Sequence, residues 1–321
     1  MTAVAVILFV VKVVAWWLTG SISILTDALE STVNVVAGII SLYSVYIASM
    51  PRDENHPYGH GKAEFVSAAA EGSLISVAGL IIIYESIKNY VEPKAIQQLD
   101  AGIILIASTA LVNYLTGYYA LQTGKKNNSL ALIASGKHLQ TDTWSTVAIV
   151  GGLILIYFTG WTWVDNVVAI LFSFFIIYTG YKIIRSSLAG IMDESDTILL
   201  KQLVVTLNSN RTENWIDLHN LRIIKFGNIL HVDCHLTVPW YLNVNEAHHE
   251  VDLLSDLVRK QFGETVELFV HSDGCLEFSC KICSKHDCQV RKHDLVKKID
   301  WTIENASSNI KHSVITDKRE I

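Results

Sequence analysis

Long apolar runs separated by short polar breaks fill the first 190 residues, whereas the remainder has the mixed pattern of a water-soluble protein. A membrane-spanning helix needs about 20 mostly apolar residues. Six runs are of this order, and they predict a six-helix transmembrane bundle over residues 1–190. The six runs cover residues 2–18, 22–49, 65–90, 101–121, 130–159 and 164–184.

The pattern over residues 191–275 predicts a small α+β domain in the order α-β-β-α-β. Apolar positions recur with helical spacing in two segments and alternate with polar positions in three others. Ser195 or Asp196 can cap the first helix. The predicted helices cover residues 198–207 and 245–262, and the predicted strands cover 221–224, 230–238 and 266–270.

The middle strand of this domain separates apolar from polar side chains. Val232, Cys234 and Leu236 point to one face, which makes Cys234 a buried core thiol. The alternating residues, among them His231 and His235, point to the other face. For His231, a polar outer surface is the simplest interpretation.

Composition and charge agree with a membrane protein. Half of the 321 residues are hydrophobic and only 17% are charged, below the roughly 25% of a soluble domain. The net charge is −6, and no basic block indicates nucleic-acid binding. Basic residues near the segment ends gather on one side, which the positive-inside rule makes the cytoplasm. These residues are Arg52, Lys62, Lys125, Lys126, Lys182 and Arg185.

The small domain and both termini are therefore expected in the cytoplasm. No organelle-targeting sequence is recognisable, which favours the inner membrane of a bacterial cell, crossed several times.

Two of the apolar segments carry polar side chains on one helical face. In the fifth, His138 and Asp142 lie at i and i+4, with Cβ atoms roughly 5–6 Å apart. In the second, Asp27, Glu30 and Asn34 lie at i, i+3 and i+7. An Asp at the centre of a membrane helix costs about 2.5–3.5 kcal/mol, and such residues almost always face the bundle interior and mark an ion path. The alternative is an interfacial pair that only snorkels.

If the two polar faces meet, they supply four nitrogen and oxygen donors. Glu30, Asn34, His138 and Asp142 then match the number and type of ligands of a tetrahedral divalent-metal site. Lys12, in the first apolar segment, has two open explanations. Its stem can snorkel, or its ammonium can pair with a carboxylate inside the bundle.

The polar loop after the second apolar segment offers three more metal-type ligands. Asp53, His56 and His60 lie within eight residues, and the neighbouring Pro and Gly residues favour a loop conformation. The alternative is a structural turn with incidental histidines.

Residues 276–321 form a C-terminal extension with four of the five cysteines at or near its start. Cys280, Cys283, His286 and Cys288 have the spacing of a Cys3His zinc knuckle. A disordered metal-scavenging tail is the alternative. The polar stretch 296–321 is expected to be frayed.

Three stretches of the sequence are typical of one transporter family: AWWLTGSISIL at residues 15–25, NHPYGHGK at residues 55–62 and the His138-x3-Asp142 pair. Through them the sequence resembles the cation diffusion facilitator family of divalent-metal antiporters. The resemblance extends from the first apolar segment to about Cys275. The resemblance implies a transport site between the second and fifth helices, with Glu30, Asn34, His138 and Asp142 as ligands.

This chain departs from the family pattern in the second helix. The family usually has Asp or His at the position of Glu30 and Asp at that of Asn34. The neutral amide removes one negative charge, so iron(II) and manganese stand beside zinc as candidate substrates. Asp27 is an alternative ligand or a proton relay.

The resemblance also implies sites outside the membrane. Asp53, His56 and His60 correspond to a second metal site, and Lys62 and Asp193 to a charge pair near a dimer interface. The cytoplasmic domain then resembles a metallochaperone-like α+β fold that forms a homodimer when it binds zinc. Its zinc ligands would be His219, His235, His248, His271 and Asp273.

The predicted function is proton-coupled efflux of divalent transition-metal cations from the cytoplasm, with the metal ion acting as substrate and as regulator. A membrane-anchored metal sensor is the alternative, although a sensor does not need acidic and imidazole groups in two membrane segments. An enzyme is not expected, because Ser31 and Ser145 have no obvious catalytic partner.

Overall fold

The structure, a computed structural model, describes residues 2–92, 96–126, 130–227 and 229–314; within the helices, the side chains of residues 2, 3, 124, 130–135 and 138 are not described. The chain divides into two compact units. Unit 1 comprises Met1–Ile47 and Glu64–Leu188, and unit 2 comprises Ala48–Ala63 and Ala189–Ile321.

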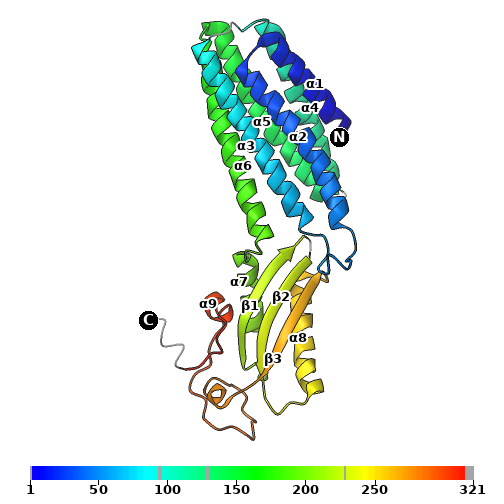
Figure 1. The fold of residues 1–321 in the computed structure, drawn as a ribbon. Helices are drawn as coiled ribbons and strands as arrows, with labels where there is room; N and C mark the ends of the chain where they lie inside the picture. Colours follow the sequence, from blue (N-terminus) through cyan, green and yellow to red (C-terminus); the bar gives the residue numbers. More distant parts are fainter. Residues whose placement is uncertain (1, 93–95, 127–129, 228, 315–321) are drawn as a thin grey trace. The chain divides into compact units, whose positions relative to one another are not determined.

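Unit 1 is a bundle of long helices (Figure 1). In the described part of the chain, five helices are long and apolar enough to cross a membrane, whereas the apolar stretch of the first helix, Val4–Thr19, is shorter. The sixth predicted span therefore stays a prediction. The helices are α1 (Thr2–Thr19), α2 (Ile22–Ala48), α3 (Ala63–Val91), α4 (Leu99–Lys126), α5 (Leu130–Thr159) and α6 (Trp163–Ile191).

The outer surface of unit 1 is apolar, as contact with lipid requires. Large side chains such as Ile39, Leu42 and Phe174 are exposed. Contiguous exposed apolar surface of this kind is rare in soluble monomers. The interior is built from smaller and branched residues, of which Ala15 on α1 and Ile149 on α5 are buried in one cluster.

A carboxylate from α6 fixes the start of α2. Asp165 accepts hydrogen bonds from the Ser21 hydroxyl at 2.7 Å, the Ile22 N–H at 2.6 Å and the Ser23 N–H at 3.2 Å. The first N–H groups of a helix lack intrahelical partners, and a negative charge is favourable there. Because Asp165 is buried, this cap holds α2, and with it the polar face of α2, against α6.

Helices α3 and α6 approach each other closely through glycines. A Cβ atom on Gly72 would lie 2.9 Å from the Gly180 carbonyl oxygen, so a larger side chain there would force the helices apart. Small residues allow this close backbone approach in membrane helices. The α3–α6 pair forms part of the wall of the cavity described below.

Unit 2 contains the predicted α-β-β-α-β order, here α7 (Thr197–Ser209), β1 (Asp217–Phe226), β2 (Ile229–Val238), α8 (Val244–Phe262) and β3 (Val266–Gly274) (Figure 1). The strands form one sheet in the order β1-β2-β3, with β1 antiparallel and β3 parallel to β2. The loop of residues 48–63 also belongs to this unit.

The core of unit 2 lies between the sheet and the helices α7 and α8. Val232, Cys234 and Leu236 of β2 are buried in it, which confirms the predicted apolar face and the buried thiol. Burial raises the pKa of Cys234 to about 12, which keeps it an unreactive thiol. Asp196 caps α7, as predicted, and accepts hydrogen bonds from the N–H groups of Ile198 and Leu199.

The two outer strands are longer than the sequence pattern predicted. β1 begins at Asp217 and β3 continues to Gly274. The added residues are mostly polar and have low strand propensity, but they pair with β2. In β1 this pairing is interrupted by an irregularity between His219 and Arg222. As a result, His219, His271 and Asp273 lie on strands.

The C-terminal extension is folded as far as residue 314, so the prediction that residues 296–321 are frayed is wrong for the described part. Trp301 is buried in the core of unit 2. The Arg211 guanidinium lies 4.2 Å from the centre of its ring. The extension includes a short 3-10 helix, η1 (Glu277–Lys281), and α9 (Ile303–Ala306).

Candidate metal-transport and metal-binding sites

The polar faces of α2 and α5 meet inside unit 1. The amide nitrogen of Asn34 on α2 lies 3.4 Å from a carboxylate oxygen of Asp142 on α5. One turn away, the Thr146 hydroxyl donates a hydrogen bond to Asp27 at 3.1 Å. These two contacts place α2 and α5 side by side, as the predicted shared site requires. The side chain of His138, one turn before Asp142, lies outside the described part.

Glu30 and Asn34 line a cavity of about 240 Å³ that is also bounded by α3 and α6. Glu30 interacts electrostatically with Asp142 and with Asp27. Glu71 of α3 and Thr179 of α6 add oxygen atoms to the same cavity. Glu71 was not among the predicted ligands, although an acidic residue in an apolar segment is a signal visible in the sequence.

Asp27 and Lys12 form a buried ion pair, which explains a lysine in an apolar segment. The Lys12 ammonium lies 2.9 Å from Asp27 and donates a hydrogen bond to the Ser31 hydroxyl at 2.9 Å. Of the two explanations for Lys12, the structure favours pairing over snorkelling. Because Asp27 is held by Lys12 and Thr146, it is less suited to replace Asn34 as a ligand.

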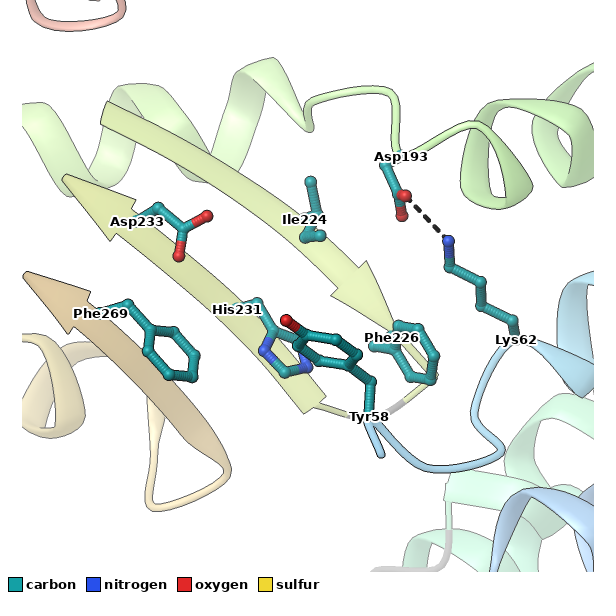
Figure 2. A pocket seen from close by; sticks show the side chains of 8 residues that line it. All are labelled: Tyr58, Lys62, Asp193, Ile224, Phe226, His231, Asp233 and Phe269. Carbon is teal, nitrogen blue, oxygen red and sulfur yellow. Dashed lines mark hydrogen bonds and ion pairs between the residues drawn. The ribbon is translucent and has the colours of Figure 1, made fainter. Parts of the chain in front are cut away.

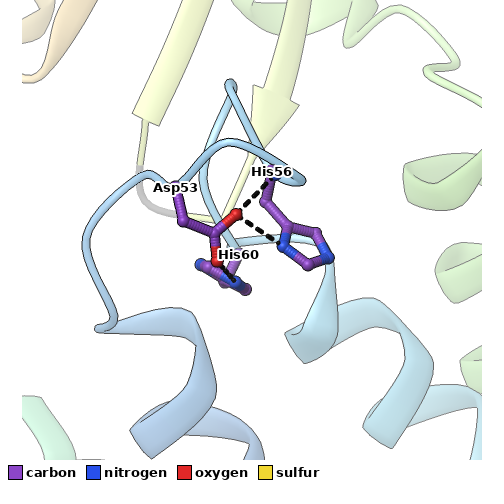
Figure 3. Close-up of side chains that lie close together, drawn as sticks. All are labelled: Asp53, His56 and His60. Atoms are coloured by element: carbon purple, nitrogen blue, oxygen red, sulfur yellow. Dashed lines mark hydrogen bonds and ion pairs between the residues drawn. The ribbon is translucent and has the colours of Figure 1, made fainter.

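The loop of residues 48–63 brings Asp53, His56 and His60 together (Figure 3). One carboxylate oxygen of Asp53 lies 2.9 Å from His56 Nδ1, and the other lies 3.5 Å from His60 Nε2. The backbone N–H of His56 also donates to Asp53 at 2.6 Å. Desolvation raises the pKa of Asp53, but the hydrogen bonds and charges of the two histidines outweigh it and lower the pKa below its ordinary value. Three ligands from one turn can hold a cation that also keeps water ligands.

Lys62 and Asp193, the charge pair implied by the family resemblance, lie together in unit 2. The Lys62 ammonium lies 2.8 Å from Asp193. Both residues line a cavity of about 280 Å³, in which Tyr58, Phe226 and Phe269 surround His231 (Figure 2). His231 is 4% exposed, so the prediction of a polar outer surface at this position is wrong. Aromatic rings cover it, and the Phe269 ring is nearly parallel to the imidazole at 6.3 Å.

The strand register places three histidines in a row across the sheet. His235 on β2 is paired with His219 on β1 and with His271 on β3. The rings of His235 and His219 are 5.0 Å apart, and those of His235 and His271 are 4.6 Å apart. Asp273 lies 3.6 Å from His219 Nε2 and 3.5 Å from His235 Nδ1. His219, His235 and Asp273 therefore form a compact group of potential metal ligands.

The chemistry of this group fits a divalent metal. Asp273 Oδ2 and His219 Nδ1 are buried and have no hydrogen-bond partner among the described residues. A bound ion is one of the groups that can satisfy buried polar atoms of this kind. Desolvation and the neighbouring imidazoles of His219 and His271 lower the pKa of His235, so it is neutral and able to bind metal at cytoplasmic pH.

His248 lies apart from the predicted set of ligands. It is exposed on α8, and its imidazole is 3.7 Å from Asp252 on the same helix. The compact group of His219, His235 and Asp273 does not include it. His271 lies beside the group, with its Nε2 3.6 Å from Asp273.

The C-terminal extension contacts the group of His219, His235 and Asp273, an arrangement that the sequence did not reveal. The Lys311 ammonium lies 3.1 Å from Asp273. His312 contacts Asp217 through its imidazole ring, and its backbone N–H donates a hydrogen bond to the same carboxylate at 3.0 Å. Asp217 in turn lies 3.4 Å from His219 Nδ1. Desolvation raises the pKa of Asp217, but its interactions with His219 and His312 lower it well below its usual range. Carboxylates in this position orient metal-binding histidines.

The predicted knuckle residues differ in burial. Cys283 is buried, and Cys280 and Cys288 are half-buried. His286 is exposed. His286, the fourth ligand of the predicted Cys3His knuckle, is therefore the residue least suited to a closed metal site.

Residues 1–192 match the cation efflux transmembrane domain. This chain belongs to the cation efflux family. Residues 201–275 match the cytoplasmic domain of cation efflux proteins, so the protein crosses the membrane several times and its C-terminal domain is cytoplasmic. The resemblance to the cation diffusion facilitators is confirmed.

Two relatives show the extent of the similarity. The chain is 33% identical over 237 residues to an uncharacterized transporter, sll1263, of Synechocystis, covering 74% of this chain and 76% of the relative. It is 30% identical over 279 residues to the cation-efflux pump FieF of Pectobacterium atrosepticum, covering 85% of this chain and 90% of the relative.

Proposed function

We propose that this protein exports a divalent transition-metal cation from the cytoplasm in exchange for protons. Zinc, iron(II) and manganese are the candidate substrates. The observation that carries the proposal is the contact between Asn34 of α2 and Asp142 of α5, which brings donors from two apolar helices to one place. Paired polar groups of this kind inside a bundle are typical of an ion path.

The proposed ligands are Glu30, Asn34, His138 and Asp142. Two carboxylates balance the charge of one divalent cation, the amide oxygen of Asn34 is a neutral ligand, and His138 adds an imidazole. The amide group of Asn34 can donate its N–H to Asp142 and still offer its oxygen to a metal. The oxygen-rich set suits iron(II) and manganese as well as zinc.

Proton coupling follows from the ligand chemistry. Metal ligands must lose their protons, so metal entry from the cytoplasm releases protons from the carboxylates and from His138. When the site opens to the other side, protons return and the metal leaves. Histidine suits this exchange because its ordinary pKa of about 6.5 lies near the working pH.

The cavity beside Glu30 is the proposed approach to this site. Glu71 adds a negative charge to its wall and attracts cations. The close glycine packing of α3 and α6 makes that part of the wall one rigid element. Alternating access then requires α2 and α5 to move relative to this element.

The cytoplasmic unit is the proposed regulator. The group of His219, His235 and Asp273, with His271 beside it, would bind the same class of cation that the bundle exports. Metal binding that needs two protomers stabilises a homodimer by mass action. The match of residues 201–275 to the family's cytoplasmic domain supports this homodimer.

The domains are a six-span transmembrane domain over residues 1–190, a cytoplasmic metal-binding domain over 191–275 and a C-terminal extension over 276–321. The Asp53–His56–His60 group is a further metal site, and the membrane is the inner membrane of a bacterial cell.

The test is a metal-by-metal transport measurement in proteoliposomes with an imposed pH gradient. Uptake of at least one of the three metals should follow the gradient and stop when a protonophore collapses it. Flux that ignores the gradient would contradict proton coupling. No flux of any metal, with intact cytoplasmic metal binding, would favour the membrane-anchored sensor.

A further inference from the structure

The C-terminal extension folds back onto unit 2 immediately after β3. Cys275 donates its backbone N–H to the Val238 carbonyl oxygen at 2.9 Å, which continues the pairing of β3 with β2. Ile282, Cys283 and Ile299 of the extension are buried in a small cluster with Ile216. The match to the family's cytoplasmic domain ends at residue 275, so this cluster is a feature added to the family core.

Two of the five cysteines belong to this cluster, and two more lie close to them in the chain. Cys275 packs against the group that contains Cys283. Cys280 and Cys288 flank Cys283 in the same short loop, three and five residues away. All four are free thiols, and the fifth, Cys234, lies in the sheet core instead.

One arginine holds the backbone that carries these thiols. The Arg291 guanidinium donates to the carbonyl oxygens of Cys280 and Cys283, both at 3.1 Å, and of Lys285 at 2.6 Å. The Arg291 N–H donates to the Cys288 carbonyl oxygen at 3.3 Å. The loop is therefore shaped by polar contacts in the absence of a disulfide.

We propose that Cys275, Cys280, Cys283 and Cys288 bind one structural Zn²⁺ ion in a tetrahedral four-thiolate site. The spacing Cys-x4-Cys-x2-Cys-x4-Cys contains the short Cys-x2-Cys turn common in such sites. Cys275 replaces the exposed His286 as the fourth ligand. Zinc fits because thiolates are soft ligands and because cytoplasmic thiols stay reduced rather than forming disulfides.

Binding of the ion draws the four sulfur atoms together. They form a looser group than the two His/Asp clusters, whose ligand atoms lie within 4.8 Å of one another, and zinc would bring each sulfur to about 2.3 Å from the metal. The ion then joins the end of β3 to the loop of Arg291. In this way it fixes the extension that also places Lys311 beside Asp273.

The test is metal analysis and cobalt spectroscopy of the purified full-length protein. After dialysis against a mild chelator, the wild type should retain about one zinc ion more per protomer than Cys275→Ser or Cys283→Ser. With cobalt(II) in place of zinc, the wild type should show the intense bands of tetrahedral cobalt thiolate, and both variants should lose them. His286→Ala and Cys234→Ser are the matched controls and should behave as the wild type does.

A thiol-protection experiment avoids variants that fail to fold. Zinc added to the metal-stripped wild type should slow alkylation of Cys275, Cys280 and Cys288 together and leave that of Cys234 unchanged. Protection of Cys280 and Cys288 without Cys275, or loss of the cobalt bands in His286→Ala, would overturn the four-thiolate site in favour of the Cys3His arrangement. Zinc-independent alkylation of all the cysteines would overturn a metal site altogether.

Discussion

Asn34 is the residue at which the proposed transport site has a neutral ligand. Its amide nitrogen contacts Asp142 at 3.4 Å, and Glu30 lies close enough to interact with the same carboxylate. A third carboxylate at this point would increase the attraction for a divalent cation. It would also increase the repulsion among the carboxylates when no cation is bound.

Asn34→Asp should therefore tighten zinc binding at the transport site by about tenfold, which corresponds to about 1.4 kcal/mol. The measurement is the zinc concentration dependence of transport in proteoliposomes. Asn34→Leu, which has no oxygen ligand, should weaken binding instead. Unchanged affinity in both variants would mean that Asn34 is not a ligand.

Lys311 is a second residue whose charge is expected to affect metal binding. Its ammonium pairs with Asp273 at 3.1 Å, so a cation that binds Asp273 must displace it. Lys311→Met should raise the zinc affinity of the cytoplasmic cluster by about 0.2–1 kcal/mol, the usual strength of a partly exposed ion pair. Competition with a fluorescent zinc chelator measures this change.

Lys298→Met is the control, because Lys298 is an exposed lysine of the same extension. It should leave the affinity unchanged. A gain in affinity that persists when His235 is replaced by Ala would show that Lys311 acts elsewhere.

At the scale of elements, helix α7 depends on a cap that also forms an ion pair. Asp196 accepts hydrogen bonds from Ile198 and Leu199 and pairs with Lys225 at 2.6 Å. Chiefly through Lys225, these contacts lower the pKa of Asp196 below its ordinary value. The stabilisation is therefore complete above the unfolded pKa of about 3.9 and is lost as the pH falls through the lower folded value.

Asp196→Ala should destabilise α7 by about 1 kcal/mol at neutral pH. Hydrogen exchange of the first-turn amides measures this as faster exchange in the intact protein. Asp256→Ala, at an exposed position on α8, is the control. If the exchange rates of the two variants are equal, the cap is not what holds the start of α7.

Helices and strands could be predicted from the sequence where the hydrophobic pattern within the segment itself determines them. Long apolar segments give helices, and the alternation in β2 gives its buried face. The ends of β1 and β3 were missed because His219, His271 and Asp273 occupy them, and only pairing with β2 makes them strands. The same register brings His219 and His271 to either side of His235, which no local pattern reveals.

Candidate site residues can also be recognised only where the signal is local. Glu30, Asn34 and Asp142 stand out as candidates because they are polar groups in apolar helices, and Asn34 contacts Asp142. Cys275, Lys311 and His312 could not be assigned, because their roles depend on how the extension folds back. His231 was misinterpreted because the aromatic residues that bury it come from distant parts of the chain.

At the scale of the whole molecule, the two units offer different kinds of candidate metal ligands. The candidate ligands of unit 1 lie in an apolar bundle, where an uncompensated charge is costly. A cation that binds there is expected to replace protons. Unit 2 has histidine and aspartate groups at its surface loop and on its sheet. The first arrangement suits transport and the second suits sensing.

The central claim is that α2 and α5 share one cation, and proton-driven metal uptake into inverted vesicles tests it most directly. His138→Ala and Asp142→Ala should each abolish uptake while the protein remains folded and inserted. Asp100→Asn, at an exposed position on α4, should transport normally. Normal uptake by both site variants would contradict the account.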